Sequence, residues 1–328
     1  MLQIGQVVKT LAVGRNVTCL YGGHQAKEER QSLSVAPDVV VATPGRLLDH
    51  LTHERLDLSK IALVVLDEFD KILELGFEET MRQVMGFMPG TARRILTSAT
   101  PMTNEVPAFV KMDGAALLDC RGVDGPAARM EKWMVGEEKG LKKTELLLKL
   151  LPFCDGKTMV FANTRETARH LAATLRRSGL KVASYHAELS QADREKAVAM
   201  FRNGSVAVLA STDLAARGLD IEGGVDNIIH YDVPLTEQIF VHRNGRTARV
   251  GAHGRIFVFQ GEGESLPDFM PDFDDWQWGS ARTAAASAAM PDVTTLHLMA
   301  GKKEKISRGD VLGFLLAHNK ISPQLMWG

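Results

Sequence analysis

The sequence predicts an α/β fold of two domains, each built around a parallel β-sheet. Apolar runs of strand length alternate with stretches of helical periodicity along residues 17–259. The runs are rich in Val, Ile and Leu and barely alternate with polar residues, which is typical of strands buried on both faces of a parallel sheet. A segment rich in Gly, Ala and Pro at 121–129 separates the runs into two series. We therefore expect two sheets, each covered by helices on both faces.

The two series of runs define the expected elements. The expected strands lie at 17–23, 38–44, 61–68 and 93–100, and then at 157–164, 181–189, 206–213, 227–234 and 254–259. Between them we expect helices, among others over 166–180 and 190–204. Ser190 is suited to cap the start of the second helix and Gly204 to end it. The two predicted domains are 1–121 and 122–259.

The residues after 259 differ in character. Residues 261–280 contain six acidic residues and no basic ones, and 281–291 are of low complexity. We therefore expect a solvated linker over 260–293. An apolar pattern then resumes as a short strand, a basic turn and the start of a helix, which predicts a partial further module over 294–328.

The composition excludes several classes of protein. The 328 residues are 45% hydrophobic and 24% charged with a net charge of −1, which suits two buried cores and excludes general disorder. Cys19, Cys120 and Cys154 show no C-x-x-C spacing, which excludes a disulfide scaffold and a zinc finger and favours a reducing compartment. No apolar run approaches the roughly 18–20 residues that span a bilayer, and the first residues do not read as a signal peptide. We expect a cytoplasmic monomer without a membrane partner, and any basic surface must be local.

An acidic turn follows the run at 61–68. Asp67, Glu68 and Asp70 stand where this strand is expected to end, and ligands of open α/β sheets lie at the carboxyl ends of strands. A carboxylate there can hold Mg²⁺ through water, and a neighbouring one can orient an attacking water. The alternative is a solvated acidic turn.

A second candidate site is the segment His-Arg-Asn-Gly-Arg-Thr-Ala-Arg at 242–249. Arg243, Arg246 and Arg249 are three residues apart, so we expect them on one face of a helix. Crowded guanidiniums repel unless an anion or carboxylates lie among them, and arginine suits the charge that develops on a transferring phosphoryl group. The alternative is a surface helix with a basic face.

Three glycine-containing turns are further candidates for binding a phosphate. Thr43–Arg46 (TPGR) precedes a helix start, where backbone N–H groups and an arginine suit a phosphate, although an ordinary turn would look the same. Gly22-Gly23 allows close backbone approach or simply a turn. Gly156-Lys157-Thr158 resembles the end of a phosphate-binding loop, but Leu151 stands where G-x-x-x-x-G-K-[ST] needs glycine, and the segment opens a strand. We expect no phosphate at this segment. The 328 residues contain no match to the full G-x-x-x-x-G-K-[ST] pattern.

In this order and spacing, these segments resemble the DEAD-box RNA helicases from residue 1 to about 260. The matching motifs are Gly22-Gly23, Thr43-Pro44-Gly45-Arg46, Asp67-Glu68-Phe69-Asp70, Ser98-Ala99-Thr100, Val160–Thr164, Gln191-x-x-Arg194, Ser211-Thr212-Asp213, Arg217-Gly218-Leu219-Asp220 and His242–Arg249. Phe69 replaces the alanine of the family, and Ala248 stands where glycine is usual. The resemblance implies two RecA-like domains, the first of them incomplete.

The resemblance also implies a mechanism in which ATP binds between the domains. Asp67 would hold Mg²⁺ through water and Glu68 would orient the attacking water, with Asp70, Ser98, Thr100 and His242 completing the catalytic motifs. Arg246 and Arg249 would reach the γ-phosphate, while Gly218 and Asp220 hold the nucleotide. RNA would be held by its backbone at Gly22, Gly23, Thr43, Pro44, Gly45, Arg46, Thr164, Gln191, Arg194 and Thr212. Closure on RNA would complete the site, so that hydrolysis depends on RNA and drives local unwinding.

The last module resembles the start of the RRM-like domain of the DbpA-type subgroup. Thr294–Phe314 carries this likeness, with a basic cluster at Lys302, Lys303, Lys305 and Arg308. The alternative for the cluster is a solvated charged turn. The subgroup implies structured RNA and ribosome assembly.

The family's adenine-reading Q motif and P-loop have no counterpart, and the last module is too short for an RRM core. We therefore expect an incomplete copy of a larger helicase, with a strand at 93–100 that lacks a neighbour and with weak ATP binding and no unwinding by the chain alone. Two alternatives are a non-catalytic RNA-binding shortened paralogue and, less well matched by the motifs, a DNA helicase.

Overall fold

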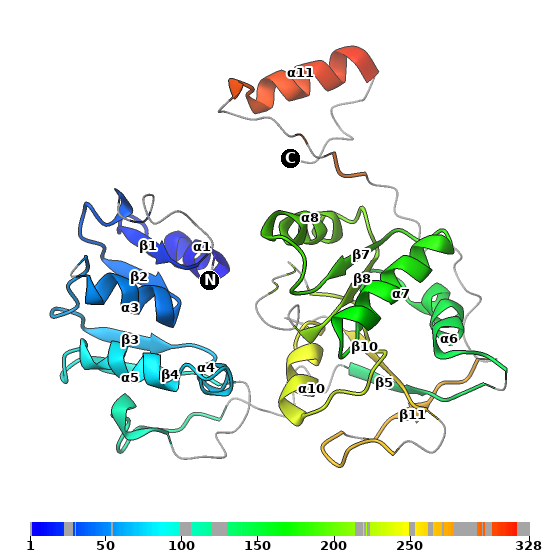
Figure 1. Cartoon of the computed structure of the whole chain (residues 1–328), viewed down its shortest axis with the longest axis horizontal. Helices are drawn as coiled ribbons and strands as arrows, with labels where there is room; N and C mark the ends of the chain where they lie inside the picture. Colours follow the sequence, from blue (N-terminus) through cyan, green and yellow to red (C-terminus); the bar gives the residue numbers. More distant parts are fainter. Residues whose placement is uncertain are drawn as a thin grey trace.

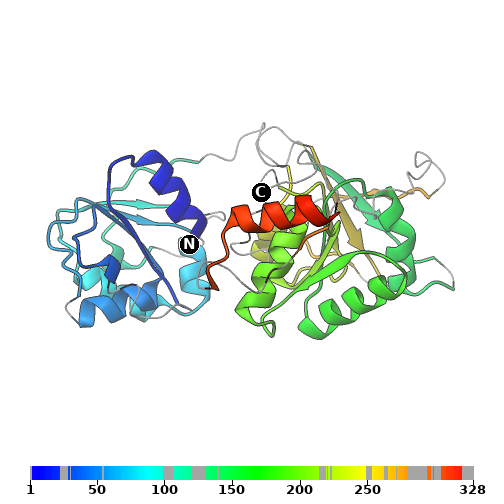
Figure 2. The ribbon, with the colours of Figure 1, turned by 90° about the horizontal axis from the view of Figure 1, so that it is seen from above.

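The structure is a computed structural model. It describes the whole chain except residues 1, 23–28, 30, 54, 99–105, 120–129, 139, 214–218, 220, 222–223, 249–252, 262–264, 271, 279–293, 297, 299–303 and 320–328. The described residues form two lobes that stand side by side (Figure 2). A separate helix, α11 (Arg308–Asn319), stands apart from both in Figure 1.

The described residues of the first lobe form four strands in two separate sheets. Its elements are α1 (Leu2–Leu11), β1 (Val17–Leu20), β2 (Val39–Ala42), α3 (Pro44–Thr52), β3 (Leu63–Leu66), α4 (Phe69–Glu74), α5 (Glu78–Gly86), β4 (Arg93–Leu96) and the 3₁₀ turn η1 (Ala108–Val110). β1 pairs with β2 and β3 with β4, both in parallel. The expected strand at 93–100 therefore has one neighbour among the described strands. Leu63, Val65 and Ile95 on this small sheet are 47%, 54% and 47% exposed.

The second lobe is built on a seven-stranded parallel sheet in the order β11-β5-β10-β9-β6-β8-β7. Its elements are β5 (Met130–Val135), α6 (Lys143–Leu150), η3 (Leu151–Phe153), β6 (Thr158–Phe161), α7 (Arg165–Arg177), β7 (Val182–Tyr185), α8 (Gln191–Arg202), β8 (Val208–Ser211), β9 (Asn227–His230), α10 (Glu237–Asn244), β10 (Gly254–Phe259) and β11 (Asp274–Asp275). All nine expected strands are present. Ser190 caps α8 by accepting the Asp193 N–H, as predicted, and Gly204 follows the C-cap residue Asn203 with a φ of +81°.

Alternate residues of the second sheet pack in two separate hydrophobic cores, because successive side chains of a strand point to opposite faces of the sheet. Val160, Ala210 and Phe257 pack with α6 and α7 on one face. Met159, Leu209 and Ile256 pack with α8 and α10 on the other. Burial of both faces is the physical reason for the almost uninterrupted apolar runs.

Two strands of the second sheet were not predicted. β5 (MEKWMV) carries Glu131 and Lys132, so it does not look like an apolar run, yet it pairs with β10 over its whole length. β11 pairs with β5 at the edge.

The prediction of a solvated linker is wrong for residues 265–278. We call the described part of this segment the strap. Phe269, Met270 and Phe273 pack on one core of the second lobe, while Trp276 and Trp278 pack on the other. The acids of the segment suggested solvent exposure, but the aromatic residues between them decide its position, since each large ring buries apolar area.

Trp276 anchors the strap, and its removal is expected to destabilise the second lobe. Its ring lies within 6 Å of Trp133, Phe153 and Phe257. We expect Trp276→Ala to lower the free energy of unfolding by ~2 kcal/mol, less than for a fully buried aromatic because the ring is partly exposed. Urea unfolding followed by circular dichroism would measure the loss. Asp275→Asn is the control, and an unchanged midpoint in Trp276→Ala would show that the strap does not support the lobe.

Candidate functional site

The acidic turn lies at the carboxyl end of β3 and is held by the end of β4. The Thr97 hydroxyl donates to Asp67 Oδ1 at 2.6 Å, and the Glu68 N–H donates to the same oxygen at 3.1 Å. The Phe69 N–H donates to the Thr97 carbonyl at 3.0 Å. Glu68 adopts a left-handed backbone conformation with a φ of +50°. This conformation is strained for any residue other than glycine, and such strained residues cluster at functional sites. Ser98 follows Thr97 just beyond the end of β4.

The acidic turn of the first lobe meets the arginine-rich segment of the second. Asp70 Oδ2 lies 3.7 Å from His242 Nε2, with side-chain exposures of 4% and 6%. Asp70 is on α4 and His242 on α10, so the contact joins the lobes. Two segments that lie far apart in the sequence are thus brought together.

The prediction that three arginines share one helix face is wrong. α10 ends at Asn244, with Gly245 as its C-cap residue. Arg243 is on the helix, Arg246 lies beyond its end and Arg249 is outside the described residues. Gly245 itself has a φ of −62° and a ψ of −1°, so the helix ends there without a left-handed glycine.

Arg243 points into the second lobe and is fully buried. Its Nε donates to Asp213 Oδ1 at 2.5 Å, Nη1 to the Asp232 carbonyl at 2.9 Å and Nη2 to Asn163 Oδ1 at 2.8 Å. The guanidinium also lies 5.3 Å from the centre of the Phe161 ring. One side chain therefore joins the segments that follow β6, β8 and β9.

A neutral histidine lies beside this arginine. His230 is fully buried, and burial together with the charge of Arg243 lowers its pKa to about 3. Its Nε2 lies 3.0 Å from Asn244 Oδ1, the geometry of an N–H donor to an amide oxygen. His230 therefore adds no positive charge to the arginine-rich segment near neutral pH.

Arg246 lies just beyond the end of α10. Its Nη1 donates to the Leu219 carbonyl at 2.9 Å. Two residues later, Ala248 is 2% exposed and adopts φ +51°, the left-handed region that glycine enters more easily. The backbone thus keeps a glycine-like conformation at a position that carries alanine.

The first-lobe residues assigned to RNA lie after β1 and β2. Gly22 is in the turn after β1, while Thr43 precedes α3 and Pro44, Gly45 and Arg46 form its first turn. Thr43 makes no side-chain cap, so the first N–H groups of α3 are not capped by it. Gly23 is outside the described residues.

The second-lobe residues assigned to RNA share the carboxyl edge of one sheet. Thr164 follows β6, Gln191 and Arg194 begin the helix after β7, and Thr212 follows β8. These three strands are neighbours in the order β6-β8-β7, so the sheet brings the four residues to one edge. The Thr164 hydroxyl caps α7, and Gln191 Nε2 donates to Glu195.

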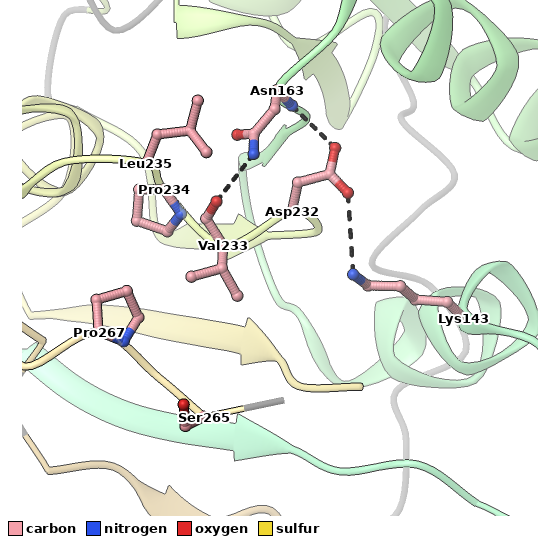
Figure 3. Close-up of a pocket in the computed structure, with 8 residues that line it drawn as sticks. All are labelled: Lys143, Asn163, Asp232, Val233, Pro234, Leu235, Ser265 and Pro267. Carbon is pink, nitrogen blue, oxygen red and sulfur yellow. Dashed lines mark hydrogen bonds and ion pairs between the residues drawn. The ribbon is translucent and has the colours of Figure 1, made fainter. Parts of the chain in front are cut away.

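A shallow pocket of about 350 Å³ lies in the second lobe, where Asn163 follows β6 (Figure 3). It is lined by Lys143, Asn163, Asp232, Val233, Pro234, Leu235, Ser265 and Pro267. The Asn163 N–H donates to Asp232 Oδ2 at 2.9 Å, and Lys143 Nζ lies 3.9 Å from Asp232 Oδ1. Asn163, Asp232 and Lys143 are thus paired with one another, and Ser265 and Pro267 of the strap form part of the wall.

The segment that resembles the end of a phosphate-binding loop opens a strand, as expected. The Lys157 N–H donates to Asp226 Oδ2 at 2.7 Å, and Lys157 Nζ donates to the Arg202 carbonyl at 2.9 Å. A carboxylate thus occupies the position where a phosphate would be cradled.

Two family models match the chain. The DEAD/DEAH box helicase model matches residues 1–108, and the helicase conserved C-terminal domain model matches residues 142–251. The chain belongs to the DEAD-box family of RNA helicases. The residues that the two models match lie in the first and the second lobe, respectively.

Relatives and solved structures agree with this assignment. The ATP-dependent RNA helicase DbpA of Escherichia coli is 33% identical over 307 residues, which cover 91% of this chain and 66% of that relative. The ATP-dependent RNA helicase DRS1 of Lodderomyces elongisporus is 36% identical over 266 residues, which cover 79% of this chain and 38% of that relative. The structure of Dbp5 from S. cerevisiae bound to RNA and ADP BeF3 gives a TM-score of 0.67 at 25% identity and covers 79% of this chain and 68% of that one. The chain therefore spans less than two thirds of the length of these two curated relatives. The solved structure confirms the predicted α/β fold with RecA-like domains.

Several residues of this DEAD-box protein lie next to the candidate site residues and carry no signal in the sequence. Arg243 was grouped with the phosphate-facing arginines, although it is a buried hub, and its partners Asn163 and Asp213 had no assigned contact. Glu29 and His50 form a buried pair beside Arg46. No local pattern marks these residues, because their partners lie far away in the sequence. Thr100, Gly218, Asp220 and Arg249 are outside the described residues, as is Gly23.

Asp67 fits a magnesium ion held through water. Its carboxylate is exposed, and both of its hydrogen bonds given above go to Oδ1. The described residues contain no group of three or more His, Cys, Asp or Glu that could hold a metal. The protein would thus supply one carboxylate, as is usual for Mg²⁺ bound together with phosphate oxygens and water.

Within the described part of the chain, no helix is long and apolar enough to cross a membrane.

Proposed function

We propose that this chain couples ATP hydrolysis to the binding and local unwinding of RNA. The contact between Asp70 and His242 carries the proposal, because it places the acidic turn of one lobe against the arginine-rich segment of the other. A site formed from both lobes can be completed only when the lobes close. If RNA is held by both lobes, hydrolysis then depends on RNA.

ATP and Mg²⁺ would lie between these two segments. Asp67 would hold the metal through water, and the metal would supply charge stabilisation at the phosphates. Glu68 would orient the attacking water, and its left-handed backbone is the kind of strain that collects at functional sites. Arg246 and Arg249 would neutralise the charge that develops on the γ-phosphate, while Gly218 and Asp220 would hold the nucleotide.

The RNA would be held by its phosphates and sugars. The residues are those after β1 and β2 in the first lobe and those on the carboxyl edge of β6, β8 and β7 in the second. Backbone contacts give affinity without sequence readout. We further propose structured RNA of ribosome assembly as the target, which rests on the likeness of Thr294–Phe314 to the DbpA-type subgroup. A cytoplasmic location is likewise proposed, and free Cys19 and Cys154 support a reducing compartment.

The RNA part of the proposal predicts a specific loss. We expect Thr212→Ala to weaken binding of single-stranded RNA by about tenfold, since a hydroxyl that donates to a charged phosphate oxygen is lost. Fluorescence anisotropy at one stated salt concentration would measure the affinity, with Ser178→Ala on the exposed end of α7 as the control. Equal affinity of the wild type for RNA and for the matched DNA strand would contradict RNA specificity.

The ATP part is tested separately. The 328 residues contain no G-x-x-x-x-G-K-[ST] pattern, so we expect slow ATP turnover by this chain. The test is whether Glu68→Gln removes the RNA-stimulated turnover that is measured while Glu79→Gln leaves it unchanged. RNA binding with no turnover that depends on Glu68 would favour the alternative function, a non-catalytic RNA-binding protein.

A further inference from the structure

Glu29 is a buried carboxylate between the two first-lobe segments assigned to RNA. It is 5% exposed. Its Oε1 accepts the Tyr21 N–H at 3.2 Å. Its Oε2 accepts Arg46 Nε at 2.6 Å and lies 2.8 Å from His50 Nε2. One side chain therefore joins the turn after β1 to the first two turns of α3.

The partners of Glu29 are arranged to hold α3 in one position. Arg46 and His50 are four residues apart and lie on the same face of the helix. His50 is fully buried, and a carboxylate only accepts hydrogen bonds, so His50 Nε2 carries the proton. Both contacts fix the helix against one oxygen, Glu29 Oε2. Arg46 Nη1 also lies 3.9 Å from Asp49 Oδ2.

The network keeps Glu29 charged. Burial alone would raise the pKa of Glu29, but the hydrogen bonds from His50, Arg46 and the Tyr21 N–H outweigh it and hold that pKa below its ordinary value. A charged acceptor forms stronger hydrogen bonds than a neutral one. The linkage between the two segments is therefore present near neutral pH.

We propose that Glu29 is a positioning residue for RNA binding, which holds the Tyr21–Gly22 turn and the Thr43–Arg46 turn in the register that one RNA backbone needs. This inference rests on the proposed function. Consecutive phosphates are a fixed distance apart, so two phosphate-binding turns act together only if their separation is fixed. Arg46 directs Nε inward to Glu29, so part of its guanidinium serves this linkage.

Glu29→Gln separates positioning from charge. Glutamine keeps the shape, but its single acceptor oxygen and its NH₂ group cannot satisfy three donors. Loss of one negative charge would by itself strengthen RNA binding, whereas loss of positioning weakens it. Glu79→Gln is the matched control, because Glu79 is 69% exposed on α5 in the same lobe and the charge change is identical.

The experiment measures the affinity of the full chain for a single-stranded oligouridylate by fluorescence anisotropy over a series of salt concentrations. We expect Glu29→Gln to weaken binding by roughly tenfold. We expect the slope of log K against log salt to become less steep by about 0.7, the value of one phosphate contact on a single strand. Glu29→Asp, which keeps the charge with a shorter reach, is expected to fall between wild type and Glu29→Gln. Hydrogen exchange without RNA should become faster at both turns together in Glu29→Gln.

Three results would overturn the inference. If the wild type binds RNA and Glu29→Gln keeps its affinity and slope, Glu29 does not position the site and the proposed function stands. If Glu29→Gln only unfolds part of the chain, the folded fraction binds with an unchanged slope, and the role is structural. If the wild type does not bind RNA, the proposed function fails and this inference fails with it.

Discussion

Arg243→Met is expected to lower the free energy of unfolding of the second lobe by about 3–5 kcal/mol. The change keeps most of the volume of the side chain but removes a fully buried charge with three hydrogen bonds. Asp213 is then left as a carboxylate with 23% exposure and no guanidinium beside it. Breaking a buried ion pair on one side is costly, because the remaining charge stays poorly solvated.

Urea unfolding followed by tryptophan fluorescence would measure this loss. Trp133, Trp276 and Trp278 all belong to the second lobe and its strap, so the signal of the described tryptophans reports on this lobe. Arg177→Met is the control, since Arg177 is exposed on α7 and donates one hydrogen bond to Thr174. Arg243→Lys should recover little, because an ammonium cannot reproduce the planar fork. A loss below about 1 kcal/mol in Arg243→Met would contradict the assignment of Arg243 as a structural hub.

Phe69→Ala is expected to destabilise the first lobe by about 3–5 kcal/mol. Phe69 is fully buried and packs in a cluster with Val64, Leu66, Met81 and Met85. Alanine is the residue that the family carries at this position, so the change restores the usual motif while it leaves a cavity. The surrounding side chains are fitted to a phenyl ring and relax only in part.

Hydrogen exchange of the segments that contain β3, α4 and α5 would measure the effect of Phe69→Ala within the first lobe. Phe87→Ala is the matched control, because Phe87 is 46% exposed at the end of α5. Phe69→Leu should cost less than Phe69→Ala, since it leaves a smaller cavity. Equal protection in Phe69→Ala and Phe87→Ala would show that Phe69 does not support the acidic turn.

The strand pattern could be predicted from the sequence because burial on both faces leaves a local record. Alternation of apolar and polar residues is weak in runs such as 157–164 and 206–213, and both contain fully buried strands of the second sheet. β5 escaped prediction because its first half carries charged residues while its pairing with β10 is decided far along the chain. The strap escaped because its acidic residues outweighed its aromatic ones in composition, although the aromatic rings determine where it packs.

The positions of some candidate site residues in the fold could be predicted for a similar reason. The positions of Asp67, Glu68 and Thr43–Arg46 at strand ends follow from local sequence, since each motif directly follows an apolar run. The end of α10 at Asn244 also has a local signal, Gly245, which the three-residue arginine spacing obscured.

Local sequence patterns were enough to predict nine of the strands, the motifs at their ends and the family to which the chain belongs. Which buried charges meet depends instead on the tertiary packing. Arg243 bonds to Asn163 and Asp213, which lie 80 and 30 residues away in the sequence. Glu29 contacts His50, which lies 21 residues away. Hydrophobic periodicity is a property of neighbouring residues, whereas these pairs depend on how the sheet orders its strands and on how helices pack against them. Burial makes such pairs costly to break, so they fix positions that no local pattern can specify.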